Sequence, residues 1–323
     1  MQSKVNSAAA GAKRAFDWRK YIVYIAFAAV FIIFSVTLHD QGFLSSMNLM
    51  NIIRQTAMIS IMAVAMTFVI SAAEIDLSVG STVALASLTT ALTLDAGYSL
   101  IVAVLVGLAT GAAVGFVNGI LVTRVAIPSF LVTLGMMGIG RGLAMWITNT
   151  APVPILNDQY NFLFGSGDIG PIPLLLIWTI LVVIGGHILL RKTKFGRETL
   201  ATGGNQNAAR FTGVNTAKIK LLVFIGSGMM AGLAGMLYAG RMQSGRFTFG
   251  EGDELSVIAA VILGGTSLFG GVGTVIGTVI GSLMIGMINN GLIIMGLDVS
   301  QQMVIKGLII ILAVAFGRKT MKR

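Results

Sequence analysis

Cysteine is absent from this 323-residue chain, so it can form no disulfide, no thiolate metal site and no cysteine nucleophile. The absence does not identify a cellular compartment. Proline occurs only 5 times and histidine only 2 times. The two histidines, His39 and His187, are far apart in the sequence and have no ligand-like spacing around them. We therefore expect no metal site.

Charged residues are also scarce, at 11% of the chain, against about 25% in a typical soluble domain. Hydrophobic residues make up 55%, and the mean hydropathy is +0.90. So little polar surface does not suit a soluble protein, whereas the 41 glycines suit helices that pack closely in a membrane. The composition predicts an all-α, polytopic membrane protein without a soluble catalytic domain.

A membrane-spanning helix needs about 20 mainly apolar residues. About ten stretches qualify, some of them interrupted by polar or glycine residues. The eighth stretch, residues 255–269, is short and could instead be a re-entrant or half-membrane segment. The candidate spans are residues 21–38, 56–73, 77–94, 98–123, 127–147, 172–190, 221–239, 255–269, 272–295 and 303–316.

The distribution of charge predicts the orientation of these spans. Residues 1–20, residues 191–220 and the segment after the last span together hold 16 of the 22 basic residues. Ten spans place all three segments on one face, which the positive-inside rule makes cytoplasmic. The net charge of +10 is then a topology signal and not a sign of nucleic-acid binding. The opposite face receives Asp40, Asp95, Asp158, Asp168, Glu251, Asp253, Glu254 and Asp298.

This topology predicts three parts of the chain. Residues 1–20 form a cytoplasmic N-terminal tail, and residues 21–317 form one membrane domain with a cytoplasmic loop at 191–220. Residues 318–323 form a cytoplasmic C-terminal tail. Both termini are therefore expected inside the cell.

The glycine-rich run at 264–277 does not predict a nucleotide site. It lacks the Gly-Lys-Ser/Thr ending of a phosphate loop, and no other stretch of the chain supplies that ending. Any ATP-driven work must then come from a partner. No cluster of His, Asp and Glu with acid–base or ligand spacing is visible, so we do not expect an enzyme.

Two sets of glycines recur every four residues. On a helix this spacing makes one flat stripe against which another backbone can pack closely, so both sets predict helix packing. The residues are Gly107, Gly111, Gly115 and Gly119, and later Gly273, Gly277 and Gly281.

Polar residues interrupt several apolar stretches. An arginine such as Arg141 costs about 2.5–3.5 kcal/mol near the middle of a bilayer on translocon scales, so its presence needs a reason. One interpretation is that these residues line a polar translocation path. The other is structural, with Arg141 ion-paired to Glu74 or Asp76 and the asparagines bridging helices. The candidate path residues are Asp76, Ser78, Asn118, Arg141, Asn289 and Asn290.

The cytoplasmic stretch at 202–220 predicts a short helix. It begins near Asn205, contains Ala208 and Ala209, and ends at Gly213 as a C-terminal cap. Such a helix could dock into a groove on a soluble partner. A solvated basic loop is the alternative.

Residues 68–81 and 260–272 are weakly similar to each other. In both, an apolar stretch runs into a polar or glycine-rich break and then resumes as a helix of small residues. Transporters often contain repeats with interrupted helices near the substrate path. Glycine-rich membrane helices also produce such similarity by chance, and the sequence does not show whether a repeat would be inverted or parallel.

Several strings resemble the ribose-type permeases, which are membrane subunits of ATP-binding-cassette (ABC) sugar importers related to branched-chain amino acid permeases. Residues 73–80 (AEIDLSVG) resemble their first signature, and residues 263–271 (LGGTSLFGG) resemble the second. Asn289 and Asn290, followed by glycine, also fit. The coupling loop of that family is similar to the set Gly203, Gly204, Asn205, Ala208, Ala209 and Gly213.

This resemblance implies a type II ABC importer-like permease in the inner membrane of a bacterial cell. It implies a second copy of the chain, surrounding lipid, two cytoplasmic ATPase subunits that bind the ATP, and a periplasmic sugar-binding protein. The chain itself would hold no cofactor. Two departures stand out: Asn207 lies where many importers have glutamate, and Glu74 lies where many relatives have glycine.

The expected function is therefore the import of a pentose or hexose by alternating access, driven by partner ATPases. An ABC permease for branched-chain amino acids or another small metabolite is one alternative. An ion-coupled secondary transporter that uses Glu74 or Asp76 is another.

Overall fold

The computed structural model describes residues 22–319, so the N-terminal tail expected at 1–20 and the last four residues, 320–323, lie outside the described residues. The described chain is mainly helical. In chain order its α-helices are α1 (Ile22–Thr37), α2 (Ser46–Ser71), α3 (Val79–Asp95), α4 (Leu100–Thr123), α5 (Ser129–Thr148), α6 (Asp158–Asn161), α7 (Leu174–Lys192), α8 (Lys194–Gly204), α9 (Gln206–Phe211), α10 (Thr216–Met242), α11 (Asp253–Leu263), α12 (Val275–Ile294) and α13 (Val299–Lys319).

The remaining regular structure is short. A 3-10 turn, η2 (His39–Gln41), follows α1, and a π-helical turn, η3 (Phe162–Ser166), follows α6. Two antiparallel pairs of two-residue strands join β1 (Val153–Pro154) to β4 (Ser244–Gly245) and β2 (Asp168–Ile169) to β3 (Ile172–Pro173). The predicted all-α class is confirmed.

Each expected span coincides with a helix, but the count of ten spans is not confirmed. Six helices of the described chain, α2, α4, α5, α7, α10 and α12, are long and apolar enough to cross a membrane by themselves. The other four expected spans correspond to α1, α3, α11 and α13. The helix α11 has 11 residues and is therefore about 16 Å long, half the thickness of the hydrocarbon core. The expected eighth span at 255–269 is thus helical only in its first part.

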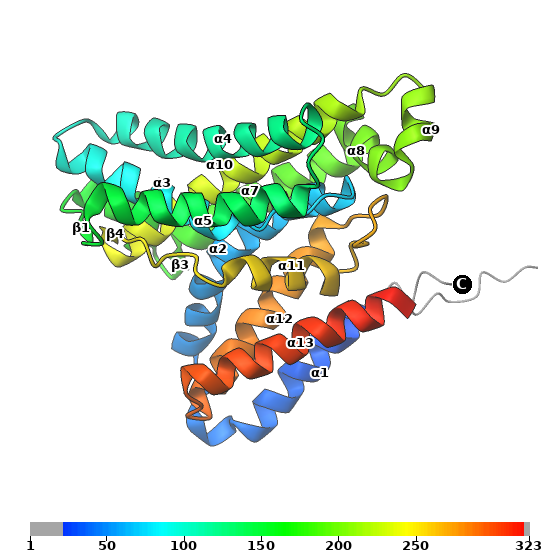
Figure 1. Cartoon of the computed structure of the whole chain (residues 1–323). Helices are drawn as coiled ribbons and strands as arrows, with labels where there is room; N and C mark the ends of the chain where they lie inside the picture. The colour runs from blue at the N-terminus through cyan, green and yellow to red at the C-terminus, as the bar shows by residue number, and fades with distance from the viewer. Residues whose placement is uncertain (1–21, 320–323) are drawn as a thin grey trace, which may run out of the picture.

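The helices form two packed groups around α2 (Figure 1). In the upper group of that view α4 packs most extensively against α10, and α3 packs against α4, α10 and α5. In the lower group α12 packs against α11 and α1, and α13 packs against α11. The helix α2 contacts α10, α7, α11 and α12, and its residues from Thr56 to Ser71 are all buried. It is the central helix of the molecule.

The two ends of the bundle differ. Figure 1 shows α8, α9 and the segment between α11 and α12 at the right, where the first and last described residues also lie. The β1–β4 pair and the turn between α3 and α4 lie at the left. We call these the α9 end and the β4 end. The first and last described residues therefore lie at the same end of the bundle.

The α4–α10 contact explains the first set of glycines. A Cβ atom added to Gly111 would collide with the backbone of Gly228, and one added to Gly115 would collide with the backbone of Phe224. Gly107 is confined by the side chains of Thr90 on α3 and Met236 on α10, and Gly119 is confined by Leu221 of α10. The stripe therefore lets two helix backbones touch, as the spacing predicts.

The second set is only partly a helix stripe. Gly277 and Gly281 lie on α12 and face the backbone of α11, at Gly264 and Ala260 respectively. Gly273 lies before α12 begins and packs on the side chain of Ser71. The prediction of a three-residue helix stripe is wrong for Gly273, because the chain is still extended at Thr274, the N-cap of α12.

The segment between α5 and α7 covers part of the β4 end. Tyr160 is fully buried and donates a hydrogen bond from its hydroxyl to the carbonyl oxygen of Met236 (2.9 Å). Burial raises the pKa of this phenol, which keeps it neutral and able to donate. Tyr160, Phe164 and Trp178 stack in sequence. This segment is therefore firmly packed on α10 and α7.

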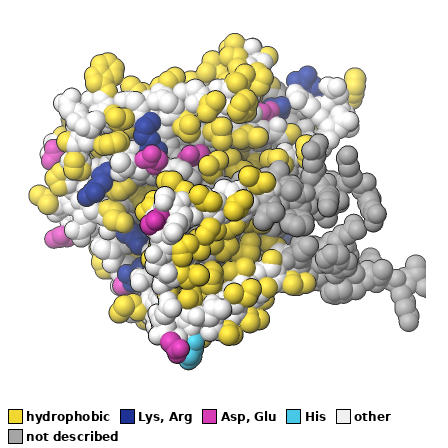
Figure 2. Space-filling model, turned by 60° about the horizontal axis from the view of Figure 1, so that its bottom comes forward, with side chains coloured by type: hydrophobic (Ala, Val, Ile, Leu, Met, Phe, Trp, Pro, Cys, Tyr) yellow, Lys and Arg dark blue, Asp and Glu magenta, His cyan; other side chains and the backbone are white. Residues whose placement is uncertain are grey.

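The outer surface of the bundle is strongly apolar. In the view of Figure 2, hydrophobic side chains form a broad surface at the centre of the molecule, with few charged side chains among them. Large hydrophobic side chains are exposed on α1, α4, α5, α7 and α13. Such a surface is stable when it is covered by lipid or by another apolar protein surface.

Candidate functional site

The break between α2 and α3 holds a buried carboxylate. Asp76 accepts hydrogen bonds from the backbone N–H of Ser78 (3.0 Å), from the Ser78 hydroxyl (2.6 Å) and from the Ser227 hydroxyl of α10 (2.8 Å). The Asn118 side-chain amide of α4 donates to the Ser78 hydroxyl (2.8 Å). Asp76, Ser78 and Asn118 are each at most 1% exposed. This network fixes the break to α4 and α10.

The same break is tied to the beginning of α5. The backbone N–H of Ile75 donates to the hydroxyl of Ser129 (3.2 Å), and the hydroxyl of Thr133 donates to the carbonyl oxygen of Ile75 (3.2 Å). These bonds satisfy polar backbone groups that the interruption of the helix leaves free. The break is therefore the point at which α2, α3, α4, α5 and α10 are joined.

Glu74 lies at the α9 end of the same break. One of its carboxylate oxygens is 2.5 Å from the ammonium nitrogen of Lys220, in the second turn of α10. The Lys220 ammonium group also donates to the side-chain oxygen of Gln206 (3.0 Å), which is the first residue of α9. Both members of the ion pair are largely buried, with 14% of the Lys220 side chain and 8% of the Glu74 side chain exposed.

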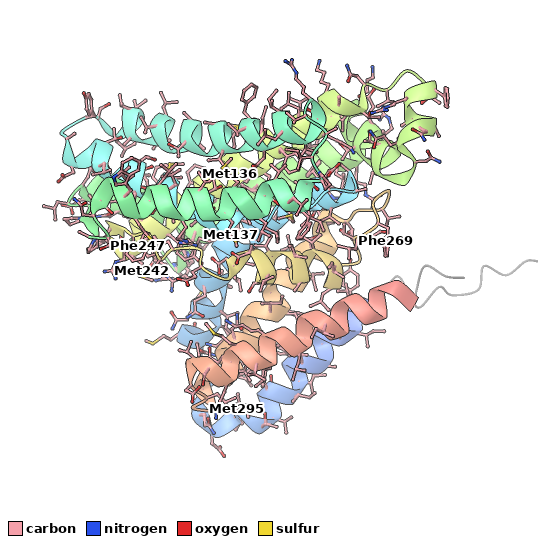
Figure 3. The ribbon with its side chains drawn as sticks, viewed as in Figure 1. Met136, Met137, Met242, Phe247, Phe269 and Met295 are labelled. Carbon is pink, nitrogen blue, oxygen red and sulfur yellow. The ribbon has the colours of Figure 1, made fainter. Side chains whose placement is uncertain are left out.

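The expected ion pair between Arg141 and Glu74 or Asp76 does not form. Ser129 at the start of α5 touches the break, but Arg141 lies twelve residues farther along α5, which is about 18 Å. Arg141 instead donates to the backbone carbonyl oxygens of Phe247 and Phe249 (2.8 Å to the latter). Figure 3 shows Phe247 near Met242, toward the β4 end, on the segment that runs beside α5. Arg141 thus holds the segment between β4 and α11.

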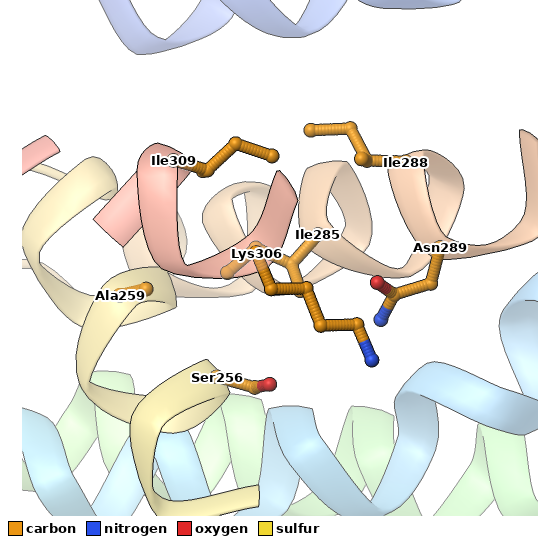
Figure 4. Close-up of a pocket in the computed structure, with 7 residues that line it drawn as sticks. All are labelled: Ser256, Ala259, Ile285, Ile288, Asn289, Lys306 and Ile309. Carbon is orange, nitrogen blue, oxygen red and sulfur yellow. The ribbon is translucent and has the colours of Figure 1, made fainter. Parts of the chain in front are cut away.

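The two adjacent asparagines of α12 have different surroundings. Asn290 forms two reciprocal amide hydrogen bonds with Asn48 of α2 (3.0 and 2.8 Å), which matches the helix-bridging interpretation. Asn289 faces a small cavity with Ser256 of α11 and Lys306 of α13 (Figure 4). The side-chain oxygen of Asn289 is buried and has no hydrogen-bond partner among the described residues. The cavity has a volume of about 10 Å³, which is room for about one water molecule.

The helix expected near Asn205 is α9. The Asn205 side chain caps its N-terminus by accepting from the backbone N–H of Ala208 (3.0 Å), and Gly213 follows its C-terminus with φ +85°. Ala209 faces the protein and is 4% exposed, whereas Ala208 is exposed. The aromatic ring of Phe211 is 93% exposed. The outward surface of α9 therefore consists of Ala208, Phe211 and their polar neighbours.

The end of α8 contacts both interrupted segments. A Cβ atom on Gly203 would collide with the carbonyl oxygen of Ser71, at the end of α2, and with the backbone N–H of Gly271. Gly271 itself donates to the carbonyl oxygen of Ser71 (3.0 Å), and Gly204 packs against Gly271. The two similar breaks of the sequence, after α2 and after α11, thus lie side by side at the α9 end.

The structure brings only some of the predicted residues together. Asp76, Ser78 and Asn118 share one buried network, while Arg141, Asn289 and Asn290 lie in three other places. Sequence reasoning missed Phe211, Ser227 and Lys220. An aromatic residue in a short polar helix is a signal that could have identified Phe211. No local signal identifies Ser227 or Lys220, because their partners are more than 140 residues away.

A family model described as the permease component of the branched-chain amino acid transport system matches residues 48–314. The chain is 40% identical to the ribose import permease protein RbsC of Bacillus subtilis, over 88% of each protein. It is 41% identical to RbsC of Escherichia coli strain K12, over 90% of this chain and 92% of that protein. It is 37% identical to the L-arabinose ABC transporter permease protein AraH of Azospirillum brasilense, over 92% and 86%. A comparison with solved structures finds no match.

Proposed function

We propose that this chain is the membrane subunit of an ABC importer for a monosaccharide. The proposal starts from the family: the chain belongs to the permease family of the branched-chain amino acid transport system. The observation that carries the sugar assignment is the 40–41% identity to ribose import permeases over about nine tenths of the chain. That similarity extends over the break at Asp76 and over α9. A pentose such as ribose or arabinose is the substrate class that these relatives favour.

The proposal assigns ATP hydrolysis to a separate subunit that docks on α9. The exposed surface around Phe211 supports this assignment, since aromatic residues are enriched at the centres of protein interfaces. An open hollow of about 370 Å³ lies beside α9, lined by Arg210 and residues 213–217, and a side chain of the partner could enter it. The permease itself would then bind no nucleotide and change no covalent bond.

A second copy of the chain is part of the proposal. On α5, Gly135, Gly138 and Gly142 lie on one exposed side, and a Cβ atom on any of them would meet no atom within 4 Å. Glycines in such a row allow close approach of another helix in a membrane. We place the translocation path between the two copies, beside this row of glycines.

Asp76, Ser78 and Asn118 have a different role in this proposal. Their mutual hydrogen bonds and nearly complete burial favour a structural function, in which they hold the break that α5 rests on. The same facts count against an ion-coupled secondary transporter. Glu74 and Asp76 would have to bind the ion, and both are already engaged by other groups of the protein.

Reconstitution with partner proteins tests the function. We expect the purified permease, an ATPase subunit and a sugar-binding protein that co-purify with it to take up ribose into liposomes only when ATP is present. We expect the measured mass of the assembled complex to correspond to two permease chains together with their partner subunits. Uptake that continues without ATP and collapses with an ionophore would indicate a secondary transporter. Uptake of leucine in place of ribose would indicate an amino acid importer.

The orientation of the α9 end is testable because the chain has no native cysteine. We expect a single cysteine at Asn207, which is exposed on α9, to react with a membrane-impermeant maleimide in inside-out vesicles but not in intact cells. A cysteine at Leu156, which is 89% exposed at the β4 end, is expected to show the opposite pattern in cells with a permeabilised outer membrane. Labelling of Asn207→Cys from outside would contradict the cytoplasmic placement of α9.

A further inference from the structure

The Glu74 carboxylate has no role in the function described so far. It is 7% exposed and lies in the break between α2 and α3. Its partner Lys220 lies 146 positions away in sequence and contacts two things at once, Glu74 of the break and Gln206 at the start of α9. The Lys220 side chain thus links α9, on which the ATPase subunit is proposed to dock, to the break between α2 and α3, which positions α5.

We propose that the Glu74–Lys220 ion pair is a coupling link that transmits displacement of α9 to the break between α2 and α3, and from there to α5. The proposal deepens the proposed function and rests on it, because it requires an ATPase subunit that moves α9. It makes Glu74 and Lys220 positioning residues for transport.

The first step of the link is the Glu74–Lys220 ion pair, which is stronger than a surface ion pair because it is largely buried. The ammonium group of Lys220 has two oxygen partners, at 2.5 Å and 3.0 Å, and little contact with water. A largely buried charge that loses its partner is costly, so the pair resists separation more than an exposed pair does. The pair on α8, Lys194–Glu198, has a longer separation of 3.6 Å and is more exposed, with 82% of the lysine side chain and 25% of the glutamate side chain exposed. Such an exposed pair contributes little.

The second step leads from Glu74 to α5. Ile75 follows Glu74 directly, and its backbone N–H and carbonyl groups are both bonded to hydroxyl groups of α5, on Ser129 and Thr133. Ala73, on the other side of Glu74, has a positive φ of 61°, which is a strained conformation for a residue other than glycine. A shift of the Glu74 side chain therefore moves the peptide that α5 is attached to.

Backbone contacts at the α9 end are independent of the Glu74–Lys220 ion pair. Gly203 and Gly204 already join α8 to both breaks by backbone contact, which keeps the α9 end assembled. The substitution Glu74→Gln leaves these contacts in place and keeps a side-chain oxygen that can accept from Lys220. The variant is therefore expected to fold and to bind its ATPase subunit, while it loses part of the transmission from α9 to α5.

The test compares Glu74→Gln with the matched control Glu198→Gln, which removes a carboxylate from the exposed pair on α8. Both are reconstituted with the co-purifying ATPase subunit and sugar-binding protein, and ribose uptake per ATP hydrolysed is measured. We expect this ratio to fall about tenfold for Glu74→Gln and to stay within about twofold of wild type for Glu198→Gln, as befits the usual range of coupling energies. Basal ATP hydrolysis and ATPase-subunit affinity are expected to be retained in both.

The double variant Glu74→Lys with Lys220→Glu separates a coupling role from a structural one. It restores the opposite charges in reversed order, and the Gln206 amide can donate to the new carboxylate. We expect it to recover most of the lost uptake per ATP. An unchanged ratio in Glu74→Gln, a folded double variant that stays uncoupled, or failure of all these variants to fold would each overturn the proposal. If wild-type protein shows no ribose-dependent ATP hydrolysis, the importer function itself fails before any variant is compared.

Discussion

The substitution Phe211→Ala is expected to abolish assembly of the permease with its ATPase subunit at working concentrations. Phe211 is a large aromatic side chain, 93% exposed, on a helix whose inner side is anchored by Ala209. Truncation of a hot-spot residue in an interface costs about 2 to 4 kcal/mol, which weakens affinity by about 30-fold to 1,000-fold. The measurement is the dissociation constant of the detergent-solubilised permease and the ATPase subunit, together with ribose-stimulated ATP hydrolysis.

The control for this prediction is Leu156→Ala. Leu156 is 89% exposed but lies at the β4 end, so its truncation removes similar apolar surface away from α9. We expect the control to bind the ATPase subunit like wild type. Wild-type affinity in Phe211→Ala would show that the partner does not dock on this side of α9. The buried Ala209 is a poorer probe, because a larger side chain there would disturb α9 itself.

The substitution Gly111→Val is expected to prevent folding of the permease. A Cβ atom at this position collides with the backbone of Gly228 and approaches that of Gly232, and backbone atoms cannot move aside by changing rotamer. Overpacking of a closely packed site costs about 1 to 3 kcal/mol where side chains can adjust. A larger effect is expected here, since α4 and α10 would have to separate along their whole contact. The measurement is the yield of monodisperse protein and its melting temperature in detergent.

A glycine in open surroundings provides the comparison. Gly185 of α7 is exposed, and a Cβ atom on it meets no atom within 4 Å. We expect Gly185→Val to give a normal yield, which separates the steric effect from the effect of valine on a membrane helix. Normal folding of Gly111→Val would mean that α4 and α10 do not make the close contact described.

Local signals in the sequence predicted the helices well. Apolar length located every expected span on a helix, because a membrane segment must satisfy its backbone within itself. The cap at Asn205 and the glycine at Gly213 correctly bounded α9, since both act on residues only a few positions away. The half-length of α11 was open in the sequence, because the glycines after Leu263 do not show where a helix stops.

Long-range partners could not be predicted in the same way. Arg141 was expected to find a carboxylate, yet it binds two carbonyl oxygens, because the rise of α5 carries it away from the break. The Lys220–Glu74 pair depends on how α10 is seated against α2, which no local pattern specifies. The inward direction of Ala209 and the outward direction of Phe211 also follow from the docking of α9 on the rest of the chain.

The backbone contact between α4 and α10 also limits how the molecule can change shape. Gly111 and Gly228 each receive the other's carbonyl group in the space that a side chain would fill, so neither helix can slide without a clash. The two helices must translate together as one rigid block. Any rearrangement during a transport cycle then has to be absorbed at other contacts between helices, such as those that α5 makes with α3 and that α13 makes with α11.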